Sequence, residues 1–190
     1  MKSLEEKILR EGIVLDGDVL KVGSFLNQQI DVDFLFKMGD EIARAFADEH
    51  ITKVLTVEAS GIAIAVAAAH YINVPVVFAK KSKTINVHGE VYSARVHSYT
   101  HCIDNNIIVP KDYLSPNDNV LVIDDFLANG KAFEGLIEIA NQAGSQVAGC
   151  AVAIEKGYQG GGDNLRAKGY KVHSLAIIDE MSAGGIKFRK

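Results

Sequence analysis

The sequence has few of the features that mark secreted or membrane-spanning proteins. Only two of its 190 residues are cysteine, which is too few for a disulfide framework. The N-terminus MKSLEEKILREG lacks the uninterrupted apolar stretch of a signal peptide, and no segment has the length of a transmembrane helix. We therefore expect a cytoplasmic protein with no membrane partner.

The chain also lacks an excess of basic charge. Its 20 Lys and Arg residues and 24 Asp and Glu residues give a formal net charge of −4. The basic residues are scattered, apart from a cluster at Lys80, Lys81 and Lys83. Because broad positive charge is what draws a protein to nucleic acid, we expect no nucleic-acid partner.

What the chain does have is enough apolar content for one sizeable core. At 190 residues and 48% hydrophobic content it is too short for two comfortable domains, so we expect a single domain over residues 1–190. Within it, we expect residues 1–50 to form an N-terminal hood with helices. Residues 51–180 are expected to form the core sheet, with an insertion at about 80–110.

Apolar segments that resemble strands alternate with helical patterns along most of the chain. Parallel βαβ units produce this pattern, so we predict an α/β fold with an open, mostly parallel sheet of about five strands flanked by helices. Ser3, with Glu6 as its capping-box partner, is predicted to begin the first helix, and Asp31 or Asp33 the second. The predicted strands are 51–57, 74–79, 119–123, 147–155 and 172–178, and the predicted later helices are 61–71, 131–143 and 164–168.

The insertion has a different pattern. Residues 87–96 and 106–109 alternate without an intervening helix, which predicts an antiparallel ribbon. Such a ribbon beside the ligand end of the sheet is either a lid over the site or an ordinary edge hairpin. The sequence favours neither.

The most informative run is VLVIDDFLANGKA at residues 120–132, where an apolar strand leads into two acids and then a glycine-bearing turn that opens a helix. Backbone amides at a helix start hold phosphate, and the acids can accept hydrogen bonds from sugar hydroxyls. A Walker A loop would need Gly at Asp125 and Ser or Thr at Ala132. The run therefore predicts a ribose 5-phosphate site, and the alternative is an acid pair that only caps the helix.

This run resembles the signature of the type I phosphoribosyltransferases, whose fold adds a hood and a flexible loop to the sheet. The resemblance implies that Asp124 and Asp125 are catalytic, with one approaching ribose hydroxyls while the other contacts neighbouring amides or water. It also implies that the turn binds the 5-phosphate of phosphoribosyl pyrophosphate (PRPP), mainly through amides, at Ala128, Asn129, Gly130, Lys131 and Ala132. Because Asn129 and Ala132 stand where threonines are frequent, the Asn129 amide and the Lys131 cation are expected to replace hydroxyl contacts.

A second strand-to-helix turn resembles the family's pyrophosphate loop. It is Glu58, Ala59, Ser60 and Gly61, and the alternative is a plain turn capped by Ser60. Mg²⁺ is expected to neutralise the leaving group, carried by PRPP rather than by direct side-chain ligation. Lys81 and its basic neighbours lie where the family has a loop that closes over pyrophosphate, although a solvated surface run is the alternative.

The resemblance implies a purine acceptor between the hood and the sheet. Leu20 is predicted to pack on the ring, Asn27 to read an edge, and Lys156 to donate to an exocyclic oxygen, which favours a 6-oxopurine. For Asn27 the alternative is a cap of its own turn, and for Lys156 an exposed solubilising residue. The chain resembles the xanthine-using members of the family over nearly its full length. The resemblance therefore implies transfer of phosphoribose to N9 of xanthine, giving XMP and pyrophosphate in purine salvage.

Three alternatives concern other roles. The enzyme could use hypoxanthine, guanine or adenine, or the fold could sense PRPP as a non-catalytic regulator. A zinc site at His97, His101 and Cys102 is not favoured, since further ligands are lacking. The family's habit also implies a homodimer.

Overall fold

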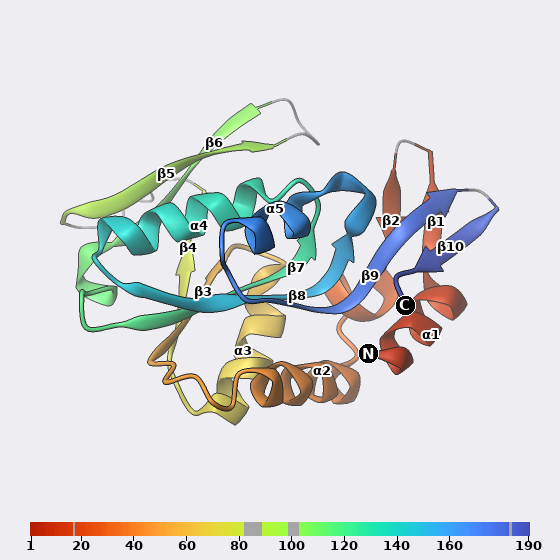
Figure 1. Cartoon of the computed structure of the whole chain (residues 1–190), viewed down its shortest axis with the longest axis horizontal. Coiled ribbons are helices and arrows are strands. Elements are labelled where there is room, and N and C mark those ends of the chain that lie inside the picture. Colours follow the sequence, from red (N-terminus) through yellow and green to blue (C-terminus); the bar gives the residue numbers. More distant parts are fainter. Residues whose placement is uncertain (17, 82–88, 99–102, 183) are drawn as a thin grey trace.

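A computed structural model describes residues 1–16, 18–81, 89–98, 103–182 and 184–190, and for 97, 98 and 103–105 it describes the backbone alone. Its centre is a six-stranded sheet of order β10-β9-β8-β7-β3-β4 (Figure 1). Five strands are parallel, and the edge strand β10 is antiparallel to β9. The predicted α/β class is therefore confirmed, with one strand more than expected. The strands are β3 (Lys53–Val57), β4 (Val76–Ala79), β7 (Asn119–Leu127), β8 (Gln146–Lys156), β9 (Val172–Ser182) and β10 (Gly185–Phe188).

Helices cover both faces of this sheet (Figure 1). On one face lie α2 (Val32–Ala45) and α3 (Gly61–Ile72), and on the other lie α4 (Lys131–Gln142) and α5 (Gly161–Ala167). Two clusters of buried apolar side chains fill the two layers. Burial on both faces explains why the central strands are nearly continuous apolar runs. It leaves the carboxyl ends of the strands as the place where polar side chains gather.

The insertion forms an antiparallel hairpin, as predicted, from β5 (Val91–Ser98) and β6 (Ile103–Pro110). It lies outside α4 as a further layer (Figure 1). The Gln142 side chain joins it to α4, because its Nε2 donates to the Ser93 carbonyl at 2.8 Å and its Oε1 accepts from the Ser93 amide at 3.1 Å. Residues 82–88 and 99–102 lie outside the described residues, so the lid hypothesis stays a prediction.

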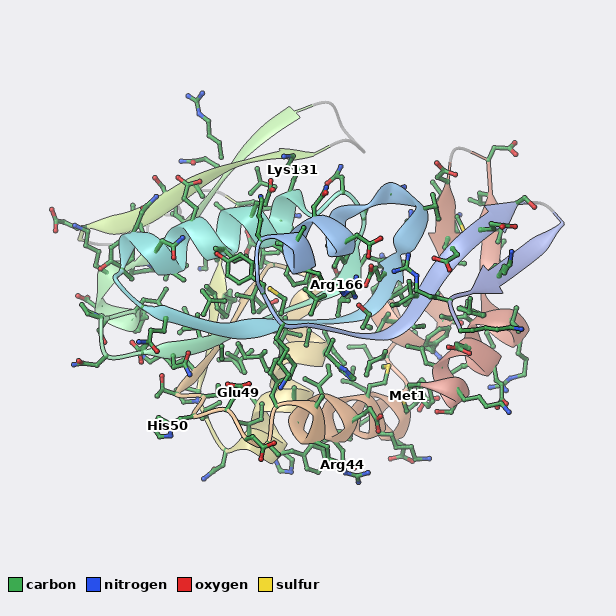
Figure 2. The ribbon with its side chains drawn as sticks, in the orientation of Figure 1. Met1, Arg44, Glu49, His50, Lys131 and Arg166 are labelled. Carbon is green, nitrogen blue, oxygen red and sulfur yellow. The ribbon has the colours of Figure 1, made fainter. Side chains whose placement is uncertain are left out.

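The N-terminal segment corrects one predicted cap and confirms another. Helix α1 (Lys2–Glu11) is capped by Met1 and not by Ser3, because the Met1 carbonyl accepts from the Leu4 amide at 3.1 Å. The α-amino group of Met1, which is labelled in Figure 2, donates to the Leu175 carbonyl of β9. Asp31 caps α2 as predicted, since its Oδ1 accepts from the Phe34 amide at 3.1 Å. The remaining elements are β1 (Ile13–Leu15), β2 (Val19–Lys21), the π-helix η1 (Gly23–Asn27) and the 3₁₀ turns η2 (Lys111–Tyr113) and η3 (Gly157–Gln159).

A buried lysine fixes η1 against the helices. Lys7 Nζ lies 2.8 Å from Asp31 Oδ2 and 3.2 Å from Glu11 Oε1, and it stands 5.3 Å and 5.1 Å from the ring centres of Phe25 and Phe34. Paired and covered by aromatic rings, the ammonium is satisfied within the fold. It thus holds in place the short helix that ends at the predicted base-reading position. None of the described helices is both long and apolar enough to cross a membrane.

Candidate active site

The two acids of the sequence motif lie near the carboxyl end of β7, in the middle of the sheet. Asp124 and Asp125 are 7% and 5% exposed. The two carboxylates have different partners. Asp124 Oδ1 accepts from the Asp125 amide at 2.9 Å, whereas the Asp125 carboxylate accepts from two other segments. That one acid is bound to an amide agrees with the expectation, while the approach of the other acid to ribose hydroxyls stays a prediction.

Asp125 joins the hood to the pyrophosphate-loop candidate. Asn27 Nδ2, at the end of η1, donates to Asp125 Oδ2 at 3.0 Å, and Ser60 Oγ donates to Asp125 Oδ1 at 3.0 Å. The three residues come from segments separated by 98 and 65 positions. A carboxylate that accepts from two sides is held in one orientation. The structure thus brings together predicted base, ribose and pyrophosphate positions at one point.

The second turn connects β3 to α3. Ser60 makes no side-chain cap to α3, so the plain capped-turn alternative does not describe it. Glu58 Oε1 accepts from the Lys81 amide at 2.7 Å, and the Glu58–Ala59 peptide bond is cis. The Gly61 backbone packs against Asp124. The four loop residues therefore lie between the acid pair and the start of the predicted closing loop.

The turn after β7 carries the predicted 5-phosphate site. Gly130 has φ of 86°, which a residue with a side chain adopts only under strain, and α4 begins at Lys131. The first amides of a helix have no partner within it, and they carry the positive end of the helix dipole. The Asn129 side chain caps its own turn, with Oδ1 accepting from the Lys131 amide at 3.1 Å.

Both side chains named for this turn have partners within the protein. Lys131 Nζ lies 2.8 Å from Glu134 Oε2 and is paired along α4. The Asn129 Oδ1 accepts from the Lys131 amide, whereas a phosphate would accept from the Asn129 Nδ2 group. Contact of the Asn129 amide and the Lys131 cation with phosphate therefore stays a prediction.

Lys156 stands at the carboxyl end of β8, next to the acid strand. Its Nζ donates to the Asp18 carbonyl at 2.5 Å and lies 5.9 Å from the centre of the Phe126 ring. Half-burial lowers the pKa of Lys156 below its usual value. The Lys156 side chain is thus directed across the Phe126 ring toward the hood. Leu20, the hood residue predicted to pack on the base, is 7% exposed. The solubilising alternative for Lys156 does not fit this placement.

The remaining predicted residues belong to the basic cluster and to the zinc alternative, and part of each lies outside the described chain. The Lys80 backbone bridges to Ile108 of β6, and Lys81 is exposed. Lys83, His101 and Cys102 lie outside the described residues, as does the side chain of His97. Among the described residues, no group of three or more His, Cys, Asp or Glu side chains is placed to hold a metal ion.

Sequence reasoning missed two side chains of this site. Phe126, directly after the acids, lies under Lys156, and its place inside the motif was an available signal. Thr56 Oγ1 is buried beside Gly61 and has no hydrogen-bond partner in the described part of the chain. A hydroxyl in an apolar strand carries no pattern that would have identified it.

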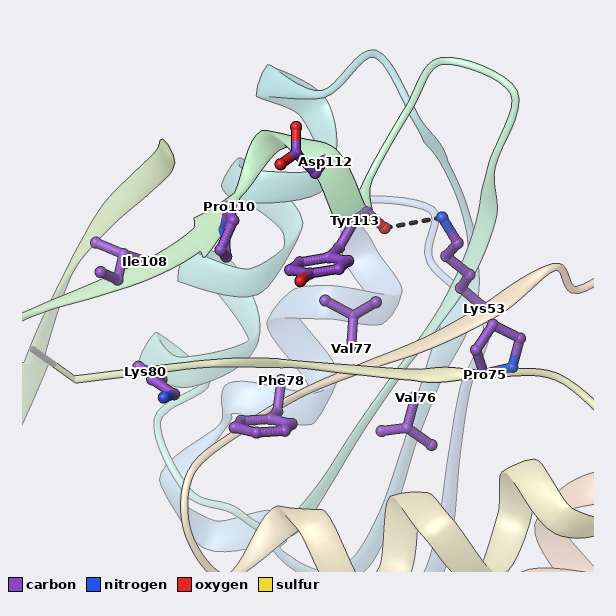
Figure 3. Close-up of a pocket in the computed structure, with 10 residues that line it drawn as sticks. All are labelled: Lys53, Pro75, Val76, Val77, Phe78, Lys80, Ile108, Pro110, Asp112 and Tyr113. Atoms are coloured by element: carbon purple, nitrogen blue, oxygen red, sulfur yellow. Dashed lines mark hydrogen bonds between the residues drawn. The ribbon is translucent and has the colours of Figure 1, made fainter. Parts of the chain in front are cut away.

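A cavity of about 700 Å³ lies along the edge strand β4, away from the acid pair (Figure 3). Val77 of β4 points toward Tyr113 of η2, and Val76 and Phe78 line the cavity from the other side of the strand (Figure 3). Lys53 Nζ donates to the Tyr113 carbonyl at 2.8 Å and closes one end. The cavity is an open groove at the sheet edge, and none of the predicted site residues except Lys80 of the basic cluster borders it.

Replacing Asp124 by Asn is expected to stabilise the ligand-free protein at neutral pH. Burial, and then the charge of Asp125, raise the pKa of Asp124 well above its ordinary value of 3.8. The native protein loses stability as pH rises from the ordinary pKa of 3.8 through the higher native pKa, because the buried carboxyl must then give up its proton. Thermal unfolding measured from pH 4 to 8 should therefore show a higher Tm for the variant than for the parent, with the difference growing as pH rises. Each kcal/mol of stability corresponds to about 2–4 °C in Tm for a chain of this size.

Asp112→Asn, on the exposed turn η2, is the matched control and should show no such pH-dependent gain. If Asp124→Asn were less stable than the parent at pH 8, the buried carboxylate would be a net stabilising group. That result would overturn the account of Asp124 as a strained acid.

Comparison with known proteins agrees with this geometry. The family model described as the phosphoribosyl transferase domain matches residues 29–185. A xanthine phosphoribosyltransferase of Bifidobacterium longum subsp. infantis is 56% identical over 192 residues, covering 100% of both chains. Another from Lachnoclostridium phytofermentans is 50% identical, covering 100% of this chain and 98% of its own.

Solved structures with this fold include two adenine phosphoribosyltransferases. That of Rhodothermus marinus has a TM-score of 0.73 at 21% identity, covering 93% of this chain and 99% of its own. That of Trypanosoma brucei, in complex with AMP, pyrophosphate and ribose-5-phosphate, has a TM-score of 0.78 at 16% identity. The match covers 96% of this chain and 82% of the Trypanosoma brucei chain. At these identities the likeness shows the shared fold. With the family model spanning most of its length and relatives matching it from end to end, the chain belongs to the phosphoribosyltransferase family.

Proposed function

We propose that the chain transfers the 5-phosphoribosyl group of PRPP to N9 of xanthine, giving XMP and pyrophosphate in purine salvage. The observation that carries the proposal is the convergence on Asp125, where Asn27 and Ser60 donate from two other segments. A donor with phosphate at one end, pyrophosphate at the other and a ribose between them fits two amide-rich turns that flank an acid. We propose that residues 1–190 work as one domain.

The proposed chemistry depends on positioning and charge. The amides of residues 128–132 would hold the 5-phosphate, and Glu58, Ala59, Ser60 and Gly61 would face the pyrophosphate. Asp125 would orient the ribose hydroxyls and stabilise positive charge that develops at C1 as the glycosidic bond breaks. The nucleophile is the purine N9, so no side chain needs to form a covalent intermediate.

We propose that Mg²⁺ enters with PRPP. Mg²⁺ commonly keeps several waters and binds through substrate phosphates. Both Asp125 oxygens already accept from protein donors, which supports an ion carried by PRPP without direct side-chain ligation. The ion would supply charge neutralisation for the departing pyrophosphate.

Lys156 supports xanthine over adenine. Its ammonium crosses the Phe126 ring toward the hood, and an ammonium is a donor that matches an exocyclic oxygen and opposes an amino group. The xanthine phosphoribosyltransferases at 50–56% identity agree with this choice. Hypoxanthine and guanine share the 6-oxygen and remain the competing substrates.

The test is pyrophosphate release with PRPP, Mg²⁺ and each of xanthine, hypoxanthine, guanine and adenine separately. We expect the highest kcat/KM with xanthine. A higher kcat/KM with adenine would contradict the role of Lys156, and preference for hypoxanthine or guanine would keep the class but change the substrate. Tight PRPP binding with no release for any purine would favour the PRPP-sensing regulator.

We also propose a cytoplasmic homodimer. Exposed apolar side chains occur on α3, β4 and η2, with Val66 48%, Tyr71 46%, Phe78 40% and Tyr113 58% exposed. We propose that a second copy covers part of this apolar surface. Light scattering after gel filtration should give about twice the chain mass of 20.5 kDa. A mass of one chain at micromolar concentration would contradict the dimer.

A further inference from the structure

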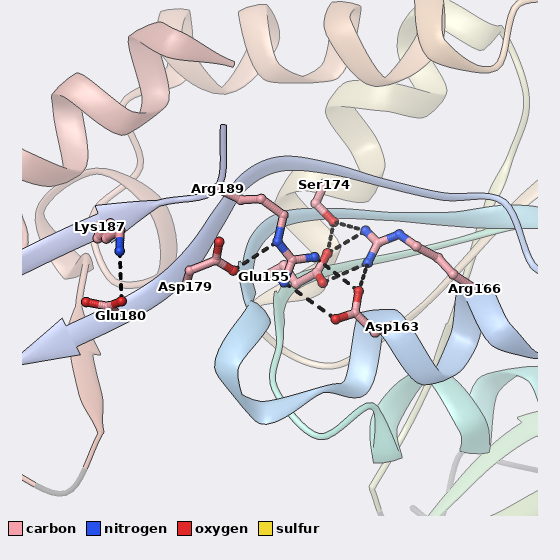
Figure 4. Close-up of polar contacts among 8 residues, drawn as sticks. All are labelled: Glu155, Asp163, Arg166, Ser174, Asp179, Glu180, Lys187 and Arg189. Carbon is pink, nitrogen blue, oxygen red and sulfur yellow. Dashed lines mark hydrogen bonds and ion pairs between the residues drawn. The ribbon is translucent and has the colours of Figure 1, made fainter.

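Glu155 is a fully buried carboxylate next to the site that the proposed reaction does not use. It precedes Lys156 in β8 and is 0% exposed. Arg166 of α5 extends toward the sheet and meets it with two parallel contacts, Nη1 to Oε1 at 2.9 Å and Nη2 to Oε2 at 2.7 Å (Figures 2 and 4). The Ser174 hydroxyl of β9 also donates to Oε2. A buried charge costs free energy unless it is paired in this way, so its presence needs an explanation beyond stability.

The ion pair supports the first turn of α5 from below. The Gly162 backbone lies directly on the Glu155 carboxylate, and any side chain at 162 would overlap it. Asp163 in the same turn is held by two guanidinium groups, with Oδ1 lying 3.0 Å from Arg166 Nη1 and 3.1 Å from Arg189 Nη1 (Figure 4). Arg189 is in turn bonded to Asp179 of β9 through Nε at 2.9 Å. The turn is therefore fixed to β8 through Glu155 and Arg166, and to β9 through Arg189 and Asp179.

That same turn touches the 5-phosphate loop. The Gly161 amide donates to the Ala128 carbonyl at 3.1 Å, and the Gly130 backbone packs on Gly161. The chain of contacts thus runs from the Glu155 carboxylate through Gly162 and Gly161 to the loop whose amides would bind phosphate. Displacement of a loop by about 1 Å is enough to cost on the order of 100-fold in a positioned reaction.

We propose that Glu155 and Arg166 are positioning residues for PRPP, with their ion pair holding the 5-phosphate loop in its binding geometry through the first turn of α5. The proposal rests on the proposed function, since it takes the loop at 128–132 to be the phosphate site. Lys156 does not depend on the pair. Its backbone is fixed by pairing of β8 with β7 and β9, so the effect should fall on PRPP and spare the purine.

The experiment compares Glu155→Gln with Glu180→Gln in the full-length enzyme. Glu155→Gln keeps shape but loses the bidentate charge pair. Glu180→Gln breaks an exposed ion pair with Lys187 on the neighbouring strands (Figure 4). We expect Glu155→Gln to raise the KM and Kd for PRPP about 10-fold, with kcat and the KM for xanthine changed less than about threefold. Glu180→Gln should leave all four values unchanged.

A double variant separates positioning from stability. Removing Arg166 alone leaves the Glu155 charge with only the Ser174 hydroxyl among these donors, and is expected to lower the unfolding temperature. Glu155→Met combined with Arg166→Met removes both charges, and replacing both partners by apolar groups of similar shape is often nearly neutral for stability. We expect this double variant to unfold near the parental temperature and still to bind PRPP about 10-fold more weakly. If PRPP affinity returned together with stability, the pair would be structural only and the proposal would be wrong.

Amide hydrogen exchange gives a readout that needs no substrate. Exchange at Gly130, Lys131 and Ala132 should be faster in Glu155→Gln than in the parent or in Glu180→Gln. Unchanged exchange and unchanged PRPP affinity would overturn the positioning role. By contrast, a parent enzyme that neither binds PRPP nor releases pyrophosphate would reject the proposed function, while faster exchange in the variant would still show that the pair holds the loop.

Discussion

Replacing Asp125 by Asn is expected to lower kcat/KM for PRPP by about 10²–10³-fold. The Asp125 carboxylate is 5% exposed and is fixed by Asn27 and Ser60, so it is already oriented before a substrate arrives. A carboxamide of the same shape retains an acceptor for one of these donors. It loses the negative charge that would stabilise C1 as pyrophosphate leaves. Steady-state pyrophosphate release at pH 7.5, with PRPP varied at saturating xanthine, measures the change.

The size of this effect depends on where the charge is used. If Asp125 acts mainly on the transition state, kcat should fall more than the PRPP affinity, which calorimetry reports separately. Asp112→Asn, which removes an exposed acid far from the motif, should keep full activity. A kcat/KM within threefold of the parent for Asp125→Asn would mean that the acid pair only supports the strand end.

Replacing Lys156 by Met is expected to lower kcat/KM for xanthine by about 10²–10³-fold and to change the ratio of xanthine to adenine activity in favour of adenine. Lys156 is the ammonium that reaches from β8 across Phe126 to the hood, where it donates to the Asp18 carbonyl. The exocyclic oxygen of a purine bound between the hood and the sheet would lose its charged donor in the variant. Methionine retains the length and apolar stem of the side chain, so packing on Phe126 should survive.

The comparison needs both bases and a surface control. We expect Lys187→Met, which removes an exposed ammonium paired with exposed Glu180, to have no effect on either base. PRPP affinity in the absence of purine should be unchanged in Lys156→Met, because the ammonium is directed to Asp18 and Phe126, which lie outside the two phosphate turns. An equal loss with xanthine and adenine would show that Lys156 shapes the pocket and does not choose the base.

Much of the fold could be predicted because it depends on local pattern. Buried parallel strands are continuous apolar runs, and α3 and α4 begin at Gly61 and Lys131, as the sequence predicts. The strand β10 was not predicted, since Gly185–Phe188 has only four residues and pairs only with its neighbour β9. The cap at Ser3 was wrong because a tertiary contact, from the Met1 amino group to Leu175, begins the helix earlier.

The candidate site shows the same division between local and distant contacts. The acids and the glycine turn occupy one stretch of sequence, so their proximity could be predicted. The Asn27–Asp125 contact joins residues 98 positions apart, and η1, which presents Asn27, has no sequence signature that periodicity detects. Lys131 pairs with Glu134, three residues further along α4, and its contact with phosphate stays a prediction. Glu155 was an available signal, since a charged residue within an apolar strand requires a partner.

The most direct measurement is a crystal structure of the protein with PRPP and Mg²⁺. We expect the 5-phosphate on backbone amides of residues 128–132, the ribose hydroxyls facing Asp125, and the pyrophosphate at Glu58 to Gly61. PRPP bound elsewhere, with no phosphate at this turn, would contradict the proposed site.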